Sequence, residues 1–89
     1  MSWAYQFEGE ALRELRRLDR ETQRRIIHFL DTRIAGAADP RRFGHSLRAE
    51  LHGLWRWRVG DYRVIGRVQE TVVLVQIVRI GHRKNVYDV

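Results

Sequence analysis

Residues 53–67 alternate apolar and basic side chains so regularly that they leave few folds open to this chain. Trp55 and Trp57 take every second position, and Arg56 and Arg58 follow them in the positions between. A period of two is typical of a β-strand with one buried face and one exposed face. The sequence therefore predicts a strand whose aromatic side packs into a core and whose other side carries arginines.

A second strand follows at once, because Gly60-Asp61 separates two such runs and a two-residue loop that begins with glycine is typical of a tight hairpin. In this register Arg58 lies opposite Arg63, and like charges in opposite positions destabilise a sheet. Arginines gathered against their own repulsion indicate an anion, and phosphate fits because the guanidinium fork matches its oxygens in pairs. The alternative is that these arginines are only solvated on a wet face, or that a slip or bulge separates them.

The remaining segments predict an α+β domain, residues 1–89, built on an antiparallel sheet. We expect a short strand at 1–7 with its aromatic side in the core, and then two amphipathic helices that cover one face of the sheet. Asp19 is placed to cap the second helix, and Gly36 to end it.

The second half supplies the other strands. Residues 37–52 are irregular, with Phe43, Leu47 and Leu51 as apolar anchors of a helical turn or an ordered loop. Residues 71–80 are apolar on both faces, as expected of a central strand that Gly81 ends. The polar tail that follows can lie across the arginines.

The overall charge is +6, from 17 basic and 11 acidic residues, and the pI is near 11. Such a surface favours polyanions, either nucleic acid or an acidic protein. The chain has no cysteine, and its four histidines show no metal-ligand spacing, so we expect neither a disulfide frame nor a metal site. It lacks a signal peptide and an apolar run of membrane-spanning length, which favours a cytoplasmic protein that does not enter a membrane.

Two motifs resemble those of the RelE branch of the RelE/ParE toxin superfamily. The first is L-W-R-W-R-V-G-D-Y-R-V-I at 54–65, preceded by F-G-H-S-L-R-A-E-L-H-G at 43–53. The second is I-G-H-R-K-N-V-Y at 80–87. A helical hairpin after a short aromatic strand is also what this family has, so the resemblance covers essentially the whole chain.

The resemblance implies the toxin of a bacterial toxin–antitoxin pair, an endonuclease that enters the ribosomal A site and cuts mRNA there without a metal or other cofactor. Arg56 and Arg58 match the two basic positions of the first hairpin strand, and Arg63 matches the arginine of the returning strand. Arg83 and Tyr87 match the family's C-terminal arginine and tyrosine. RNA can be cut by its own 2′-hydroxyl, and arginines suit the stabilisation of the charged phosphorane.

This chain departs from family members that carry lysines at the first two hairpin positions. Arginine stays protonated at any working pH, so neither Arg56 nor Arg58 suits the role of general base. His82 is the nearest histidine in the sequence and is our candidate for that role. Three further residues are expected to bind RNA: Arg48, Arg67 and Lys84.

Two other functions remain open. A ParE-like toxin would share the fold, poison DNA gyrase and cut no RNA, and a non-catalytic member would only bind RNA or an acidic peptide. A cognate acidic antitoxin is the expected protein partner of this basic chain, and contact with operator DNA is expected only through that antitoxin.

Overall fold

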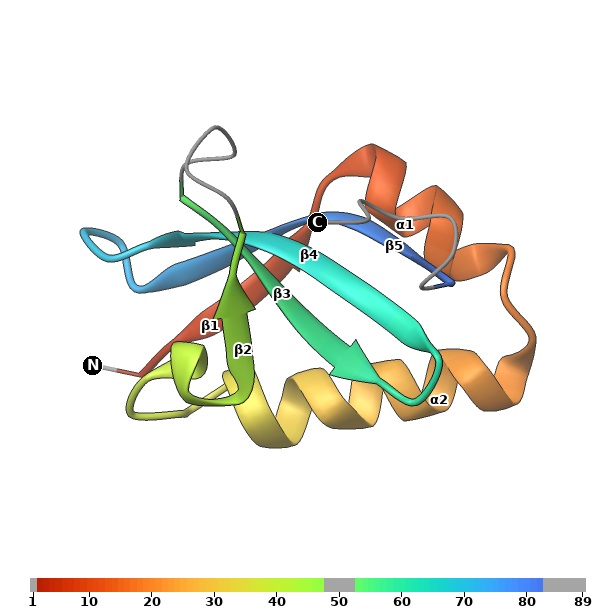
Figure 1. Ribbon diagram of the computed structural model, residues 1–89, viewed down its shortest axis with the longest axis horizontal. Helices are drawn as coiled ribbons and strands as arrows, with labels where there is room; N and C mark the ends of the chain where they lie inside the picture. The colour runs from red at the N-terminus through yellow and green to blue at the C-terminus, as the bar shows by residue number, and fades with distance from the viewer. Residues whose placement is uncertain (1, 48–52, 83–89) are drawn as a thin grey trace.

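The computed structural model describes residues 2–47 and 53–82, and its centre is a five-stranded sheet (Figure 1). The strand order is β1-β5-β4-β3-β2. β1 runs parallel to β5, and the other three pairings are antiparallel. The strands are β1 (Ala4–Phe7), β2 (Gly44–Ser46), β3 (Leu54–Val59), β4 (Tyr62–Gln69) and β5 (Leu74–His82).

Two helices connect β1 to the rest of the sheet. α1 (Gly9–Arg16) lies beside β5, and α2 (Arg20–Phe29) continues into a π-helical turn, η1 (Leu30–Ile34), and runs past the β3–β4 hairpin (Figure 1). The Asp19 carboxylate accepts a hydrogen bond from the Thr22 amide at 3.1 Å, which caps α2 and lowers the pKa of Asp19. A short 3₁₀ helix, η2 (Pro40–Phe43), leads into β2.

The two faces of the sheet carry cores of different size. The helices cover the larger core, in which Trp57 is fully buried and its Nε1 donates a hydrogen bond to the Pro40 carbonyl at 2.9 Å. The other face holds a small apolar cluster of Leu47, Leu54 and Ile65, with Val78 packed against it. The larger cluster consists of Trp3, Ala11, Leu15, Ile26, Leu30, Ile34, Trp57, Val64, Val75, Ile77 and Ile80.

The α+β architecture predicted from the sequence is confirmed, and so is the hairpin register that sets Arg58 opposite Arg63. The sheet is mixed rather than wholly antiparallel, because the N-terminal strand β1 lies beside the last strand, β5, and runs parallel to it. β5 begins at Leu74, since Val73 takes a positive φ of 55° in the preceding turn, and it continues through Gly81 to His82.

The segment before β3 also differs from the prediction. Residues 44–46 form a strand instead of a helical turn or loop. Leu47 is buried as expected, but Phe43 is 43% exposed and does not anchor the core. Leu51 lies outside the described residues.

α1 shields the part of β5 that extends beyond β1. β1 pairs with β5 only as far as Ile77, so the amide of Ile80 lacks a strand partner on that side. Glu14 of α1 supplies one: its Oε1 accepts from the Ile80 amide at 2.8 Å, and its Oε2 accepts from Arg79 Nε at 2.9 Å. An acidic side chain thus replaces a missing strand along this edge. Within the described residues, no helix is long and apolar enough to cross a membrane.

Tyr5 gives the fold an alkaline limit that can be measured. Its hydroxyl donates to Asp31 Oδ1 at 2.6 Å, and partial burial together with this carboxylate raises its pKa from 10.0 to about 12. Because the Tyr5 hydroxyl ionises less readily in the folded state, its contribution to the free energy of unfolding is complete below pH 10 and is lost as the pH rises toward about 12. We expect Tyr5→Phe to show a shallower fall in the free energy of unfolding over this window, measured by urea denaturation. Equal slopes in the two proteins would contradict the assignment.

Candidate functional site

Four arginines of the β3–β4 hairpin share the sheet face that points away from the helices. Paired residues on neighbouring strands lie on the same face, and the pairing of Trp57 with Val64 identifies the helix-covered face. The residues between them in the alternation therefore occupy the other face. We call Arg56, Arg58, Arg63 and Arg67 the arginine face.

The arginine face is organised in rows across the sheet. Arg58 pairs directly with Arg63 near the hairpin turn, with Cα atoms about 4.5–5.5 Å apart as in any antiparallel pair. Arg56 occupies the next row, opposite Ile65, and Arg67 the row after that, opposite Leu54. Arg58 is exposed, and its Nε donates to the Gly60 carbonyl at 3.4 Å.

Ile65 and Leu54 give this face an apolar floor between the arginines, and both are buried. A guanidinium stem that lies along such a floor keeps its charged end in solvent, because the methylene groups can pack while the fork stays hydrated. Two neighbouring forks can donate to several oxygens of one tetrahedral anion. The arginine face can therefore bind phosphate, and it offers no arginine that accepts a proton.

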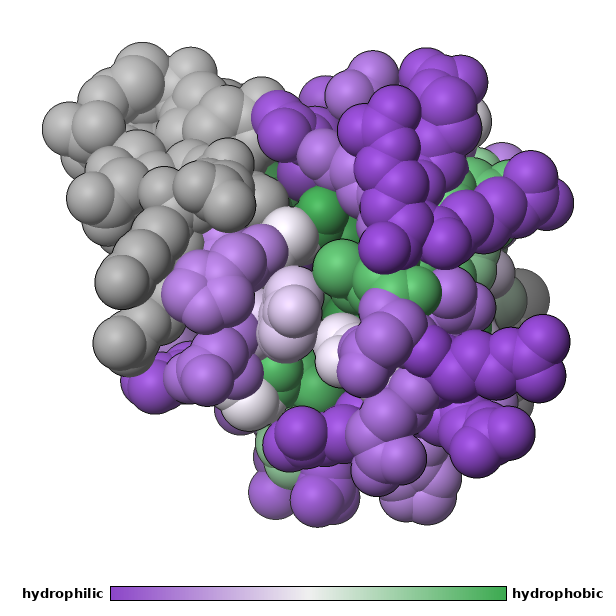
Figure 2. Space-filling view, turned by 90° about the vertical axis from the view of Figure 1, so that its right-hand side faces the viewer, coloured by the Kyte–Doolittle hydropathy of each residue, from purple (hydrophilic) through white to green (hydrophobic). Residues whose placement is uncertain are grey.

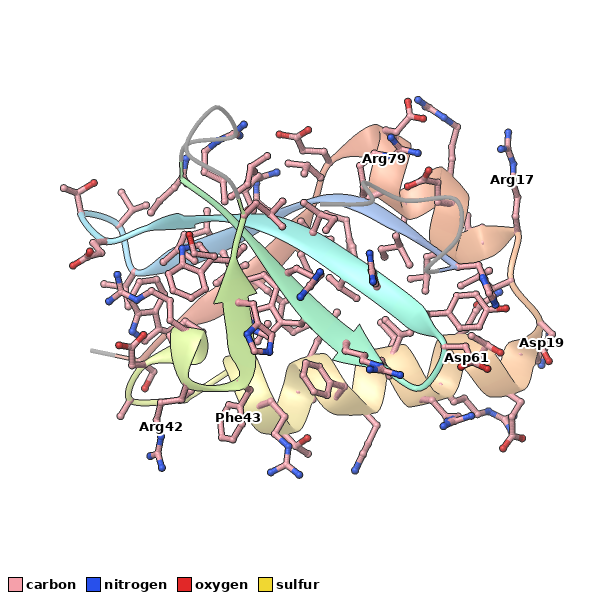
Figure 3. All side chains as sticks on the ribbon, in the orientation of Figure 1. Arg17, Asp19, Arg42, Phe43, Asp61 and Arg79 are labelled. Atoms are coloured by element: carbon pink, nitrogen blue, oxygen red, sulfur yellow. The ribbon has the colours of Figure 1, made fainter. Side chains whose placement is uncertain are left out.

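Arg79 belongs to a different arrangement. It pairs with Ile65 in the register of β4 and β5, but its guanidinium turns to Glu14 of α1, with NH2 to Oε2 also 2.9 Å (Figure 3). The Glu14 side chain is only 15% exposed, which makes this pair better shielded than the Arg13–Glu10, Arg41–Asp39 and Arg41–Glu70 pairs. Glu14 thus holds this charge at the edge of the sheet.

His82 is not brought together with the arginine face. It pairs with Tyr62, whose ring packs against the larger core, and the two rings meet edge to face at 5.6 Å and 78°. His82 and Tyr62 line a hollow with Leu18 and Arg17 at the end of the molecule shown in Figure 2, where hydrophilic side chains surround a hydrophobic band. The proximity of His82 to the hairpin in sequence did not reveal this, because the pairing register decides the face.

Four other predicted site residues, Arg48, Arg83, Lys84 and Tyr87, lie outside the described residues. Their predicted roles remain predictions. Within residues 2–47 and 53–82, no three metal-binding side chains of the His, Asp or Glu type come together.

Sequence reasoning placed His45 in an irregular segment, as a solvated loop residue rather than a contact of a ligand, and did not place it beside the arginines. β2 pairs His45 with Arg56, so its side chain starts from the arginine face. No signal in the sequence could have shown this, because a strand of three residues is too short to display a period of two.

Comparison with known proteins places this geometry in a family. Residues 5–87 match the family described as the ParE toxin of the type II toxin–antitoxin system parDE. The chain belongs to this toxin family. Among its relatives, toxin RelG of Mycobacterium tuberculosis is 36% identical over 76 residues, which cover 74% of this chain and 87% of RelG. Toxin RelE of the same organism is 32% identical over 77 residues, which cover 86% of this chain and 77% of that protein.

A solved structure agrees with the assignment. The toxin–antitoxin complex RelBE2 from Mycobacterium tuberculosis contains a chain with a TM-score of 0.84 and 29% identity to this toxin. The match covers 93% of this toxin and all of that chain. The predicted resemblance to the RelE/ParE superfamily is therefore confirmed.

Proposed function

We propose that this toxin is a ribosome-dependent mRNA endonuclease and that its arginine face binds the phosphate to be cut. The observation that carries the proposal is the direct pairing of Arg58 with Arg63 on an exposed strand face. Like charges in directly opposite positions of a sheet repel each other. A bound phosphate whose oxygens accept hydrogen bonds from both guanidinium groups offsets that repulsion.

The proposed reaction uses the 2′-hydroxyl of RNA as the nucleophile. The 2′-oxygen bonds to the adjacent phosphorus, the bond from phosphorus to the 5′-oxygen breaks, and a 2′,3′-cyclic phosphate and a 5′-hydroxyl result. Negative charge grows on the equatorial oxygens between these events, and donors fixed in advance around that charge are usually the largest catalytic contribution. Arg58 and Arg63 take this role, while Arg56 and Arg67 bind neighbouring phosphates along the strand.

The C-terminal residues complete the proposed site. Arg83 would add a third guanidinium at the phosphate, and Tyr87 would stack on a base or donate to a phosphate oxygen. Arg48 and Lys84 would contact the RNA backbone. The roles of Arg83 and Tyr87 rest on the match of the C-terminal motif to the family, and those of Arg48 and Lys84 rest on their positive charge.

We also propose an acidic antitoxin as the partner that keeps this toxin inactive. A net charge of +6 favours such a partner, and the similar RelBE2 structure is a toxin–antitoxin complex. Contact with operator DNA would then occur only through the antitoxin.

The family description also names ParE, which keeps gyrase poisoning as a second candidate function. Brief induction of the toxin in a bacterial host, followed by primer extension on several mRNAs, separates the two. We expect discrete breaks inside translated codons, and none in an mRNA whose start codon has been removed. Intact mRNA together with DNA breakage would replace the nuclease by the gyrase poison.

A further inference from the structure

The edge strand β2 places one histidine in contact range of the arginine face. His45 pairs with Arg56, so their Cα atoms are about 4.5–5.5 Å apart. Arg58 is the diagonal neighbour in the next row, about 7–8 Å away between Cα atoms. Arginine side chains from both rows can therefore reach a phosphate that also touches the His45 ring.

The backbone that carries His45 is tightly fixed on both sides. Gly44 lies so close to β3 that an added Cβ would meet Trp57 Nε1 at 2.8 Å and the Arg56 carbonyl oxygen at 2.9 Å. Beyond the strand, the Leu47 amide donates to the Leu54 carbonyl at 3.1 Å and its side chain is buried. His45 is exposed between these two anchors, so its ring is available to a ligand while its Cα position is set by the core.

The charged strand residues around His45 on this face are all basic within the described part of the chain. From β3 it is faced by Arg56 and Arg58. The preceding η2 contributes Arg41, which is paired with Asp39 and Glu70, and Arg42, which lies over the Phe43 ring. No aspartate or glutamate occupies the arginine face among the strand residues that the structure describes.

Histidine supplies the function that this face otherwise lacks. The arginines cannot accept a proton at working pH, whereas a neutral imidazole can. His82 points to the opposite face, beside Tyr62, and His28 is exposed on α2. His45 is thus the histidine that the described structure brings to the arginines.

We propose that His45 is the general base of this toxin, an inference that rests on the proposed nuclease function. The neutral imidazole takes the proton of the 2′-hydroxyl as the 2′-oxygen bonds to phosphorus. The bond from phosphorus to the 5′-oxygen breaks, and the departing oxygen takes a proton from water. The imidazolium then returns its proton to the hydroxide that remains, so that no proton is gained or lost overall.

The test is a single-turnover cleavage assay on mRNA-programmed ribosomes between pH 5.5 and 8.5. We expect the wild-type rate to rise with pH and level off, as it does for a base that must be neutral. In His45→Gln the cleavage rate at the plateau should be about 100-fold lower and should no longer rise with pH. Binding to the ribosome, measured by co-sedimentation, should be unchanged. His28→Gln is the matched control, because it changes the same side chain on the exposed surface of α2 and should follow the wild-type curve.

A second substrate distinguishes a general base from a general acid in the role of His45. When sulfur replaces the 5′-oxygen at the scissile bond, the leaving group needs no proton, so the defect of His45→Gln should persist. Recovery of the His45→Gln cleavage rate on this substrate would overturn the assignment of His45 as the base. The assignment would also fail if the rate of His45→Gln kept the wild-type dependence on pH, or if His82→Gln lost that dependence and His45→Gln did not. If wild-type toxin cuts no ribosome-bound mRNA, the proposed nuclease function fails, and the role of His45 fails with it.

Discussion

Replacement of Arg58 by glutamine is expected to lower the single-turnover cleavage rate about 100- to 1000-fold, the usual effect of removing one fixed donor to developing charge. The free energy of unfolding should change by less than about 0.5 kcal/mol. Arg58 is exposed, its hydrogen bond to the Gly60 carbonyl is long at 3.4 Å, and its removal relieves the repulsion from Arg63. A large loss of activity without a loss of stability would therefore identify a residue held in place for its ligand.

Two further variants sharpen this test. Arg58→Lys keeps the charge and removes the fork, so it should recover the rate to within about tenfold of wild type if charge dominates, and stay low if paired donation dominates. Arg17→Gln makes the same change of net charge at the end of α1, away from the sheet face (Figure 3), and should leave the rate within twofold. Urea denaturation and cleavage of ribosome-bound mRNA are measured on all three. Equal losses in Arg17→Gln and Arg58→Gln would mean that only overall charge matters.

The hairpin was predictable because two local signals agree. The alternation around Trp57 fixes which residues are buried, and Gly60, with a φ of 60°, fixes the turn and hence the register. A one-residue error in either would have put tryptophans in solvent. The pairing of Arg58 with Arg63 followed directly from these constraints.

The parts of the site that could not be predicted depend on contacts between distant segments. β2 is a strand because Gly44 fits against Trp57, which no local pattern shows. His82 was expected near the arginines, yet an extra residue in β5 opposite Ile65 and Gly66 shifts the register, and His82 comes to pair with Tyr62. The face of a residue beyond a bulge cannot be counted from the sequence.

Replacement of Trp57 by alanine is expected to lower the free energy of unfolding by about 3–5 kcal/mol, the largest effect on stability that we predict. The side chain is fully buried in the larger core and packs against the strands on both sides of β3. A Cβ added at Gly66 of β4 would meet its ring at 3.1 Å, and one added at Gly44 of β2 would meet its Nε1 at 2.8 Å. The surrounding strands cannot collapse far into the space it leaves, because they are hydrogen-bonded to one another. Trp55→Ala is the matched control, since Trp55 lies on the same face two residues away but is only partly buried, and it should cost clearly less in urea denaturation.

Trp57→Phe separates volume from hydrogen bonding and links the core to the site. It keeps most of the apolar contact but leaves the buried Pro40 carbonyl without the Nε1 donor at 2.9 Å, a loss of about 1–3 kcal/mol. Because β2 is held against this indole, we also expect the cleavage rate of Trp57→Phe to fall about tenfold at a temperature where the variant remains folded, through displacement of His45. In the His45→Gln background the same change should have little further effect on the rate. Full additivity of the two losses would show that Trp57 acts on the reaction by another route than the placement of β2.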